Sequence, residues 1–203
     1  MKYVMINTAG KTTEILVANG DKTEWYCDPD GLQASKTLLP EIDKLLDKSG
    51  LTPLNCDFFG CVTGPGSFTG IRIGVVTVKS LCYALGKSAK AVSYNRMIAL
   101  PHGGKVLSVV YGWADMYYVA TYDEHEETLA PVAMKKSEAE SFISGHGDCL
   151  LVTDARSNTA FGGSLADEKE CMRLAAEKSP LIDGETLEPL YAMLSQAERE
   201  KQK

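Results

Sequence analysis

The sequence predicts an α/β fold in which one order of elements, three strands followed by a helix, a strand and a helix, occurs twice. Three apolar runs of strand character open the chain, at residues 2–8, 12–18 and 22–27. The turn Asn19-Gly20 joins the second run to the third, because both of its residues tolerate positive φ. Helical and strand patterns then alternate up to residue 102. A shorter copy of the same order follows, which indicates an internally duplicated fold.

The first helix is expected within residues 35–50. Its apolar residues lie at helical spacing: Leu38, Ile42, Leu45 and Leu46. Pro40 suits the first turn of a helix better than its interior, so the regular helix is expected to start near Leu39. Gly50 is expected to end it.

A strand, a long helix, a brief strand and a short helix complete the first lobe. They are expected at residues 56–62, 71–85, 90–92 and 94–100. Gly86 ends the long helix, and Ser93 caps the short one, which stops at Pro101. The first lobe is therefore assigned to residues 1–102.

The second lobe, residues 103–203, is expected to be smaller and to repeat the order in shortened form. Its strands are predicted at 105–111, 116–123, 128–134 and 149–154, and its helices at 136–145 and 167–178. From residue 179 the chain is poorly patterned. This C-terminal segment is expected to return toward the first lobe.

Composition places the chain among ordinary globular proteins. It has 203 residues, of which 44% are hydrophobic and 24% charged. Its net charge of −6 and the lack of a block of Lys and Arg exclude a protein that binds nucleic acid alone. No secretory signal or uninterrupted membrane-length apolar run is visible, and the six cysteines form no CxxC pair. We expect a cytoplasmic protein without membrane contact, whose thiols are free and mostly buried.

No catalytic or metal-binding constellation emerges from the sequence. The triplet Gly10-Lys11-Thr12 is no phosphate-binding P-loop, because Met5 stands where that loop needs a glycine and a strand follows. The histidines are isolated, and no Ser or Cys occupies a nucleophile elbow. We therefore predict no catalytic residue, no metal ligand and no cofactor.

The stretch "GPGSFTGIRIG", Gly64 to Gly74, is the best-placed candidate site. It lies between a strand and a helix, where glycines allow close backbone approach and free N–H groups can hold an anion. No Lys is placed to reach a phosphate, so a bend for close packing is favoured over anion binding. The residues of this candidate anion or partner contact are Gly64, Pro65, Gly66, Ser67, Phe68, Thr69, Gly70 and Arg72.

The helix that follows carries two stripes. One is apolar and faces a core: Ile71, Val75, Val78, Cys82 and Leu85. The other is partly apolar and contains Arg72, Val76, Lys79 and Tyr83. Burial between sheet and neighbouring helices explains such a helix, and so does a partner subunit on the second stripe. Val76, Lys79 and Tyr83 are the candidate interface residues.

Several stretches together carry a resemblance to a known family. They are "INT" near the start, "LLPEIDKLL", "GPGSFTGIRIG", "AVSYNRMIAL" and "EPLYAMLSQAE". In order and spacing they resemble the TsaB (YeaZ) family, whose signature is the glycine-rich stretch. The resemblance covers the first hundred residues well and the second half weakly.

The resemblance implies an ASKHA fold, that of actin-like ATPases, with two ribonuclease-H-like lobes. It also implies a non-catalytic subunit that pairs through its first lobe with a catalytic TsaD-type subunit. A TsaE-type ATPase joins the complex, which installs threonylcarbamoyl on adenosine in tRNA. Members of the family form a homodimer when alone and meet tRNA only through the complex. A nucleotide at a subunit junction is compatible with the family but is not predicted.

This sequence departs from the family pattern at several polar positions. Asn7 replaces an Asp, Ala34-Ser35 replaces His-Ser, Tyr111–Trp113 stands for a D-A-R triplet, and Ala192 and Met193 occupy the region of a C-terminal Arg. These losses favour a scaffold. The alternative left open is an ASKHA-fold nucleotide-binding enzyme, a kinase or hydrolase, that uses the Gly64–Gly70 loop for phosphate. A protease-like protein is a third hypothesis, without a nucleophile–base pair to support it.

Overall fold

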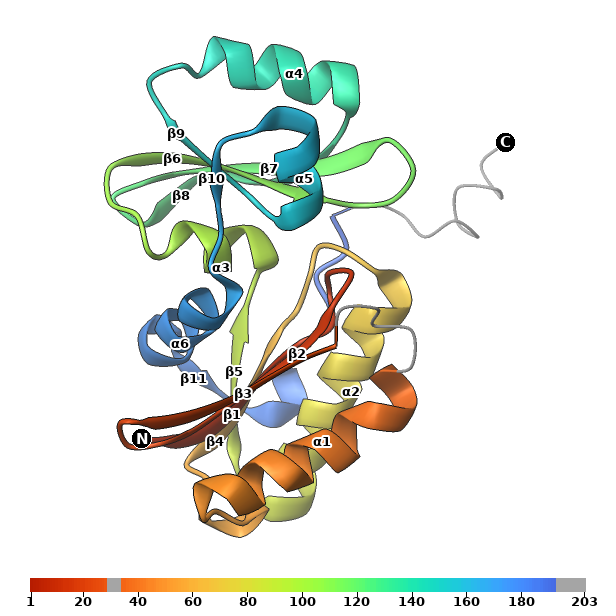
Figure 1. Cartoon of the computed structure of the whole chain (residues 1–203), viewed down its shortest axis with the longest axis vertical. Helices are drawn as coiled ribbons and strands as arrows, with labels where there is room; N and C mark the ends of the chain where they lie inside the picture. Colours follow the sequence, from red (N-terminus) through yellow and green to blue (C-terminus); the bar gives the residue numbers. More distant parts are fainter. Residues whose placement is uncertain (29–33, 193–203) are drawn as a thin grey trace.

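Two β-sheets, one in each lobe, organise the chain (Figure 1). The computed structural model describes residues 1–28 and 34–192. The first sheet has the strand order β11-β5-β4-β1-β2-β3, and the second has the order β10-β9-β6-β7-β8. In each sheet three antiparallel strands come first and two parallel strands follow, and β11 adds an antiparallel edge to the first sheet. This confirms the predicted α/β class with two lobes of βββαβα type.

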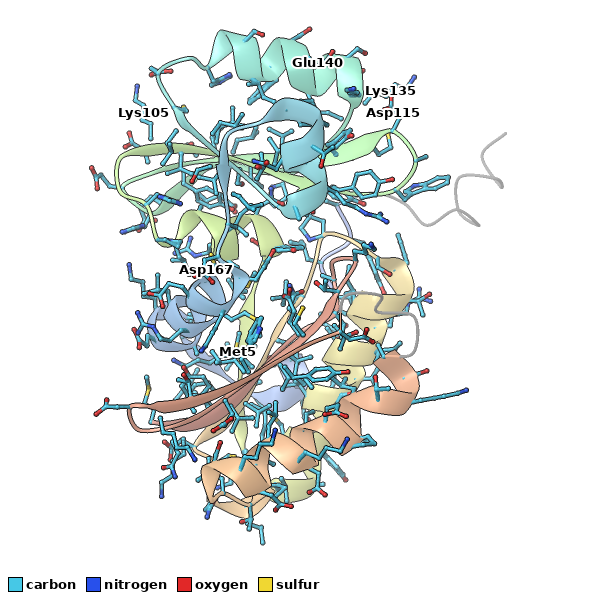
Figure 2. All side chains as sticks on the ribbon, viewed as in Figure 1. Met5, Lys105, Asp115, Lys135, Glu140 and Asp167 are labelled. Carbon is cyan, nitrogen blue, oxygen red and sulfur yellow. The ribbon has the colours of Figure 1, made fainter. Side chains whose placement is uncertain are left out.

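The first sheet follows the predicted strands closely. Its strands are β1 (Lys2–Asn7), β2 (Thr13–Asn19), β3 (Lys22–Asp28), β4 (Phe58–Val62) and β5 (Ser88–Val92). β4 is buried along its whole length, as expected for a strand with parallel neighbours on both sides. Met5 lies fully buried at the middle of this sheet (Figure 2).

The first helix, α1 (Ala34–Ser49), begins before Pro40, so the prediction that Pro40 would lie in its first turn was wrong. The regular helix does not start near Leu39, because Pro40 lies inside it. A proline there leaves the carbonyl of Lys36 without its helical N–H partner. Lys36 and Pro40 are both exposed, so water can take that hydrogen bond, while the buried apolar stripe holds the helix to the sheet. A short 3-10 turn, η1 (Pro53–Asn55), follows.

The second helix, α2 (Phe68–Leu85), starts three residues before the predicted Ile71. Ser67 is its N-cap, and the Ser67 hydroxyl accepts a hydrogen bond from the Gly70 N–H. Gly86 ends the helix in the left-handed conformation, with φ of 63°. Because Thr69 and Gly70 stand between Phe68 and Ile71 in the first turn, apolar periodicity alone did not reveal the true start.

The short helix α3 (Tyr94–Ala99) lies between the two sheets (Figure 1). It packs against β6 and β7 of the second sheet and against α6. Asn95 is completely buried, and its amide donates hydrogen bonds to the carbonyl groups of Ser108 and Tyr118. The helix that ends the first half of the sequence therefore ties the two lobes together.

The second lobe contains two elements that the sequence did not reveal. Its predicted elements are β6 (Lys105–Tyr111), β7 (Met116–Asp123), β8 (Glu126–Lys135), α4 (Lys136–Gly145) and β9 (Leu150–Thr153). The unpredicted ones are α5 (Ala155–Phe161) and β10 (Ser164–Leu165). Both are too short to show apolar periodicity, and α5 forms where Asp154 accepts a hydrogen bond from the Ser157 N–H as its N-cap.

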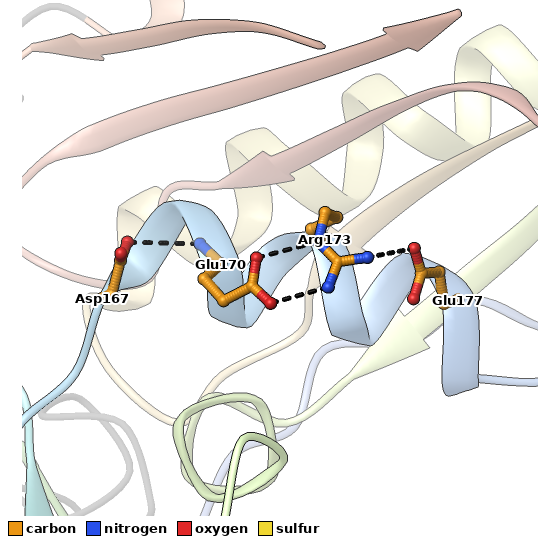
Figure 3. A network of polar contacts seen from close by, with 4 residues as sticks. All are labelled: Asp167, Glu170, Arg173 and Glu177. Atoms are coloured by element: carbon orange, nitrogen blue, oxygen red, sulfur yellow. Dashed lines mark hydrogen bonds and ion pairs between the residues drawn. The ribbon is translucent and has the colours of Figure 1, made fainter. Parts of the chain in front are cut away.

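The last elements lie on the first lobe. They are α6 (Glu168–Lys178), β11 (Leu181–Ile182) and the 3-10 turn η2 (Gly184–Thr186). α6 packs on β1 and β2, and β11 pairs antiparallel with β5. Along the outer face of α6, Arg173 bridges Glu170 and Glu177, while Asp167 caps the helix (Figure 3).

Candidate functional site: the glycine-rich loop and helix α2

The glycine-rich loop joins β4 to α2 and packs directly on the loop after β1. A Cβ atom at Gly66 would overlap the carbonyl oxygen of Ala9, and one at Gly70 would overlap that of Thr8. At Gly64 the obstacle is the carbonyl oxygen of Leu190, 2.6 Å from the position of a Cβ. Each of these three glycines is therefore needed because a backbone carbonyl of another segment approaches it.

Several polar groups of the loop form hydrogen bonds within the chain. The Ser67 N–H donates to the Ala9 carbonyl at 2.7 Å, and the Thr8 hydroxyl donates to the Gly70 carbonyl at 2.7 Å. The Gly70 N–H, a donor that could have met an anion, points instead to the Ser67 hydroxyl. An anion beside this loop would face the negative ends of the Thr8 and Ala9 carbonyl dipoles. These contacts support close packing over an anion cradle.

An aromatic and cationic cluster lies at the first turn of α2. The rings of Phe68 and Tyr191 are stacked, with centroids 4.6 Å apart and 5° between the ring planes. The Arg72 guanidinium lies 5.6 Å from the Phe68 ring centroid and 5.7 Å from that of Tyr191. Its Nε donates a hydrogen bond of 2.8 Å to the Tyr191 hydroxyl. Tyr191, which the sequence did not single out, thus belongs to the candidate site.

Helix α2 leaves an apolar face uncovered. Its buried residues are Ile71, Gly74, Val75, Val78 and Cys82. Val76 and Tyr83 on the other stripe are 60% and 79% exposed. Lys79, between them, donates to the Leu187 carbonyl and pairs with Glu188 at 3.0 Å. The candidate interface residues therefore line one face together with Arg72.

Among residues 1–28 and 34–192, α2 is the one helix long and apolar enough to cross a membrane by length and composition. Its mean hydropathy is 1.3, yet only 28% of it is buried. Arg72 and Lys79 interrupt the exposed stripe, and the buried stripe packs on β4 and β5. A helix with such an uncovered apolar face inside a folded lobe is typical of a protein-binding surface.

Thr69 and Pro65 take less specific places in this loop. Thr69 stands in the first turn of α2 but does not cap it, since Ser67 does. The peptide bond between Gly64 and Pro65 is cis. The Tyr94 N–H donates to the Gly64 carbonyl at 2.7 Å, which connects the loop to the start of α3.

Two acidic side chains that the sequence analysis missed, Glu14 and Glu168, lie close enough for the charge of Glu14 to raise the pKa of Glu168. The Asn7 side chain donates to Glu14 Oε2 at 2.9 Å, and the Thr12 hydroxyl donates to Glu14 Oε1 at 2.8 Å. The Tyr94 hydroxyl donates to Glu168 Oε1 at 2.6 Å. The available signal was Glu14 in the apolar strand "TEILVA". Polar and apolar residues do not alternate along this strand, so it has no solvent-facing side on which a glutamate would be expected.

Burial controls the protonation of this pair. It raises the pKa of Glu14 above the ordinary carboxyl value, although hydrogen bonds from Thr12 and Asn7 act in the opposite direction. Burial, followed by the charge of Glu14, raises the pKa of Glu168 well above its ordinary value. Asn7, where the family pattern has Asp, is a donor to this pair, which an aspartate could not be.

Among the described residues, the acidic pair is not part of a larger cluster of metal-ligating side chains. Across the described parts of the chain, no group of three or more His, Cys, Asp and Glu side chains is arranged to hold a metal ion.

His146 stacks on Phe142, and its Nδ1 lies 2.8 Å from the Phe142 carbonyl. In the second lobe, Tyr111 lies under the Arg156 guanidinium at 4.7 Å, and Met193 lies outside the described residues.

Comparisons with known proteins agree on one family. A family model described as "TsaD: tRNA N6-adenosine threonylcarbamoyltransferase" matches residues 32–144, more than half of the chain. The tRNA threonylcarbamoyladenosine biosynthesis protein TsaB of Escherichia coli is 26% identical over 138 residues, 64% of this chain and 58% of the relative. TsaB of Bacillus subtilis is 25% identical over 183 residues, 79% of this chain and 80% of the relative. The match thus spans less than two thirds of the E. coli protein.

A solved structure shows the same fold. YeaZ from Pseudomonas aeruginosa superposes with a TM-score of 0.73 at 19% identity, covering 94% of this chain and 99% of that one. The two-sheet architecture is therefore shared with that protein, and it agrees with the ASKHA-like fold of two related lobes that the resemblance implied.

Proposed function

The chain belongs to the TsaD-related family, in its TsaB (YeaZ) branch, and from this premise we propose that it is a partner subunit in the synthesis of threonylcarbamoyladenosine in tRNA. The observation that carries the proposal is the exposed apolar face of α2, formed by Val76 and Tyr83 beside Arg72. The face belongs to a helix that is otherwise packed on the first sheet, so a protein partner is the expected cover.

The partner that we propose is a TsaD-type catalytic subunit. The match of this chain to the TsaD family model and to TsaB relatives supports the pairing. A TsaE-type ATPase is proposed to join the assembly. The chain is proposed to form a homodimer when alone and to act in the cytoplasm. It is proposed to reach tRNA only through the complex, because its net charge of −6 does not favour binding to a phosphate backbone.

We propose that the chain has no catalytic centre and no cofactor of its own. Asn7 stands where the fold family places an aspartate, and its amide is committed to Glu14 and to the Ala9 N–H. The alternative of a nucleotide-binding kinase or hydrolase needs phosphate at the Gly64–Gly70 loop. Carbonyl oxygens of Thr8 and Ala9 press on that loop, so no contact of the described residues favours this alternative.

The proposal is tested by mixing the purified chain with the TsaD-type subunit of the same organism. Size-exclusion chromatography with light scattering is expected to give one species with the summed mass. The variant Val76→Asp places a charge in the apolar face and is expected to raise the Kd at least about tenfold. Leu165→Asp, at an exposed apolar residue of the second lobe, is the matched control and should bind like the wild type. Separate elution of the two wild-type proteins would contradict the proposed function.

A further inference from the structure

The C-terminal segment, defined here as residues 184–191, runs back along α2 from its end to its start. Near the end of α2, a Cβ atom at Gly184 would lie 2.5 Å from the Cβ of Cys82. At mid-helix, Lys79 binds the Leu187 carbonyl and Glu188. At the first turn, Tyr191 reaches Phe68 and Arg72. The segment thus extends the uncovered face of α2 on one side.

The glycine-rich loop is shaped to receive this segment. The Leu190 N–H donates to the Thr63 carbonyl at 2.8 Å, just beyond the end of β4. The Leu190 carbonyl occupies the space that a side chain at Gly64 would need. The loop therefore positions Leu190, and with it the ring of Tyr191 against Phe68.

This docking orients the side chain of Arg72. The stacked rings of Phe68 and Tyr191 lie beside its guanidinium, and the Tyr191 hydroxyl accepts a hydrogen bond from its Nε. Because the side chain is already restricted, binding a partner costs it less conformational entropy. Arg72 is exposed, and no carboxylate of the described residues lies within ion-pair distance of it. Arginine and tyrosine are also the residue types enriched at binding hot spots.

We infer that Phe68, Arg72 and Tyr191 form a pre-oriented anchor for a carboxylate of the TsaD-type partner, completed by the chain's own C-terminal segment. This inference rests on the proposed function. Arg72 supplies the charge, and Tyr191 is a positioning residue that acts through it. A second copy presenting the same α2 stripe offers no carboxylate from that stripe, and its nearby Glu188 is paired with Lys79. A bilayer would not require the oriented hydrogen bonds of a guanidinium.

Isothermal titration of the chain against the TsaD-type subunit tests the anchor. Arg72→Ala is expected to raise the Kd at least about tenfold, with Arg72→Lys in between because it keeps charge but loses the Nε donor. Tyr191→Ala is expected to raise the Kd by about threefold to tenfold, and Tyr191→Phe less, since it keeps the stack and loses only the hydroxyl. Arg156→Ala is the matched control, because Arg156 is an exposed arginine stacked on a tyrosine in the other lobe.

A salt series separates an anchor from a merely structural role. Raising the salt from ~50 mM to ~0.5 M should weaken wild-type binding and affect Arg72→Ala much less, while thermal unfolding of all variants stays close to that of the wild type. Equal Kd values for the wild type and Arg72→Ala would overturn the anchor and leave the proposed function standing. So would loss of self-association in Arg72→Ala with unchanged binding to the TsaD-type subunit. Absence of wild-type binding would overturn both.

Discussion

Glu168 stands in the first turn of α6, where its Oε1 accepts a hydrogen bond from the Tyr94 hydroxyl. Its Oε2 is buried and has no hydrogen-bond partner among the described residues. The charge of Glu14 is close enough to oppose ionisation of Glu168. A carboxyl group in these surroundings is stabilised in its neutral form, so the fold holds a proton here at pH values where free glutamate has lost it.

This proton gives the stability of the chain a definite pH dependence. Because the pKa of Glu168 in the folded state lies above its ordinary value of 4.5, the folded chain binds more protons than the unfolded chain in the interval between the two values. The free energy of unfolding therefore falls as the pH rises through that interval, with a limiting slope of about 1.4 kcal/mol per pH unit for one group. Below the interval the contribution of Glu168 is constant.

Glu168→Gln is accordingly expected to be more stable than the wild type at neutral and alkaline pH and closer to it near pH 4.5. Urea unfolding across this pH range measures the difference. Glu170→Gln on the same helix is the control, because hydrogen bonds from Arg173 lower the pKa of Glu170 and its contribution has the opposite sign. A difference between wild type and Glu168→Gln that does not change with pH would contradict the assignment.

At the scale of elements, α2 is positioned by glycines that leave room for the backbone of segments distant in the sequence. Gly70 lies in the first turn, where alanine normally favours a helix by about 1 kcal/mol. The carbonyl of Thr8, directly after the central strand β1, occupies the place of its Cβ, and a backbone group cannot move aside as the end of a flexible side chain can. Steric exclusion therefore outweighs helix propensity at this position.

Gly70→Ala is expected to lower the free energy of unfolding by roughly 2 kcal/mol or more, in spite of the better helix propensity. Chemical denaturation followed by circular dichroism gives this value. Gly147→Ala serves as the control, because no atom lies within 4 Å of a Cβ at Gly147 and its φ is not positive. An unchanged midpoint for Gly70→Ala would mean that the loop after β1 can move away.

At the scale of the whole molecule, one core extends through both lobes. The main cluster of buried apolar residues includes the first sheet, α1, α2 and α6, and also Val106, Ala120 and Val152 of the second sheet. A smaller cluster lies on the other face of the second sheet, under α4. The lobes are therefore expected to unfold together.

Thiol labelling under native conditions checks this expectation. All six cysteines are free; Cys27 is exposed, Cys149 is half-buried, and the other four are buried. Burial also raises the pKa of the Cys82 thiol to about 11, which lowers its thiolate fraction. Iodoacetamide is expected to modify Cys27 first and Cys149 next, with the buried four reacting together in denaturant, as followed by mass spectrometry. All four buried cysteines lie in or beside elements of the first lobe, so their modification at denaturant concentrations below the unfolding transition seen by circular dichroism would indicate that this lobe opens alone.

The sequence predicted most regular elements because their apolar periodicity is long enough to read. The order of strands from Lys2 to Asp28 and the αL end of α2 at Gly86 follow from local signals. Contacts between segments distant in the sequence, such as Tyr94 with Glu168 or Phe68 with Tyr191, could not be predicted because no local pattern encodes them. The loop sequence did predict close packing over anion binding, but not which carbonyl groups approach its glycines.

The return of the chain to its first lobe has a consequence for the order of folding. β5 gains its outer neighbour only from β11, and the Lys90 ammonium donates to the carbonyl of Ala176 in α6. During synthesis the first five strands leave the ribosome well before these partners. The nascent first lobe therefore carries an open sheet edge at β5, and the ammonium of Lys90 lacks its acceptor, until α6 and β11 have been synthesised. Docking of α6 and β11 is thus the closing step in the folding of the first lobe.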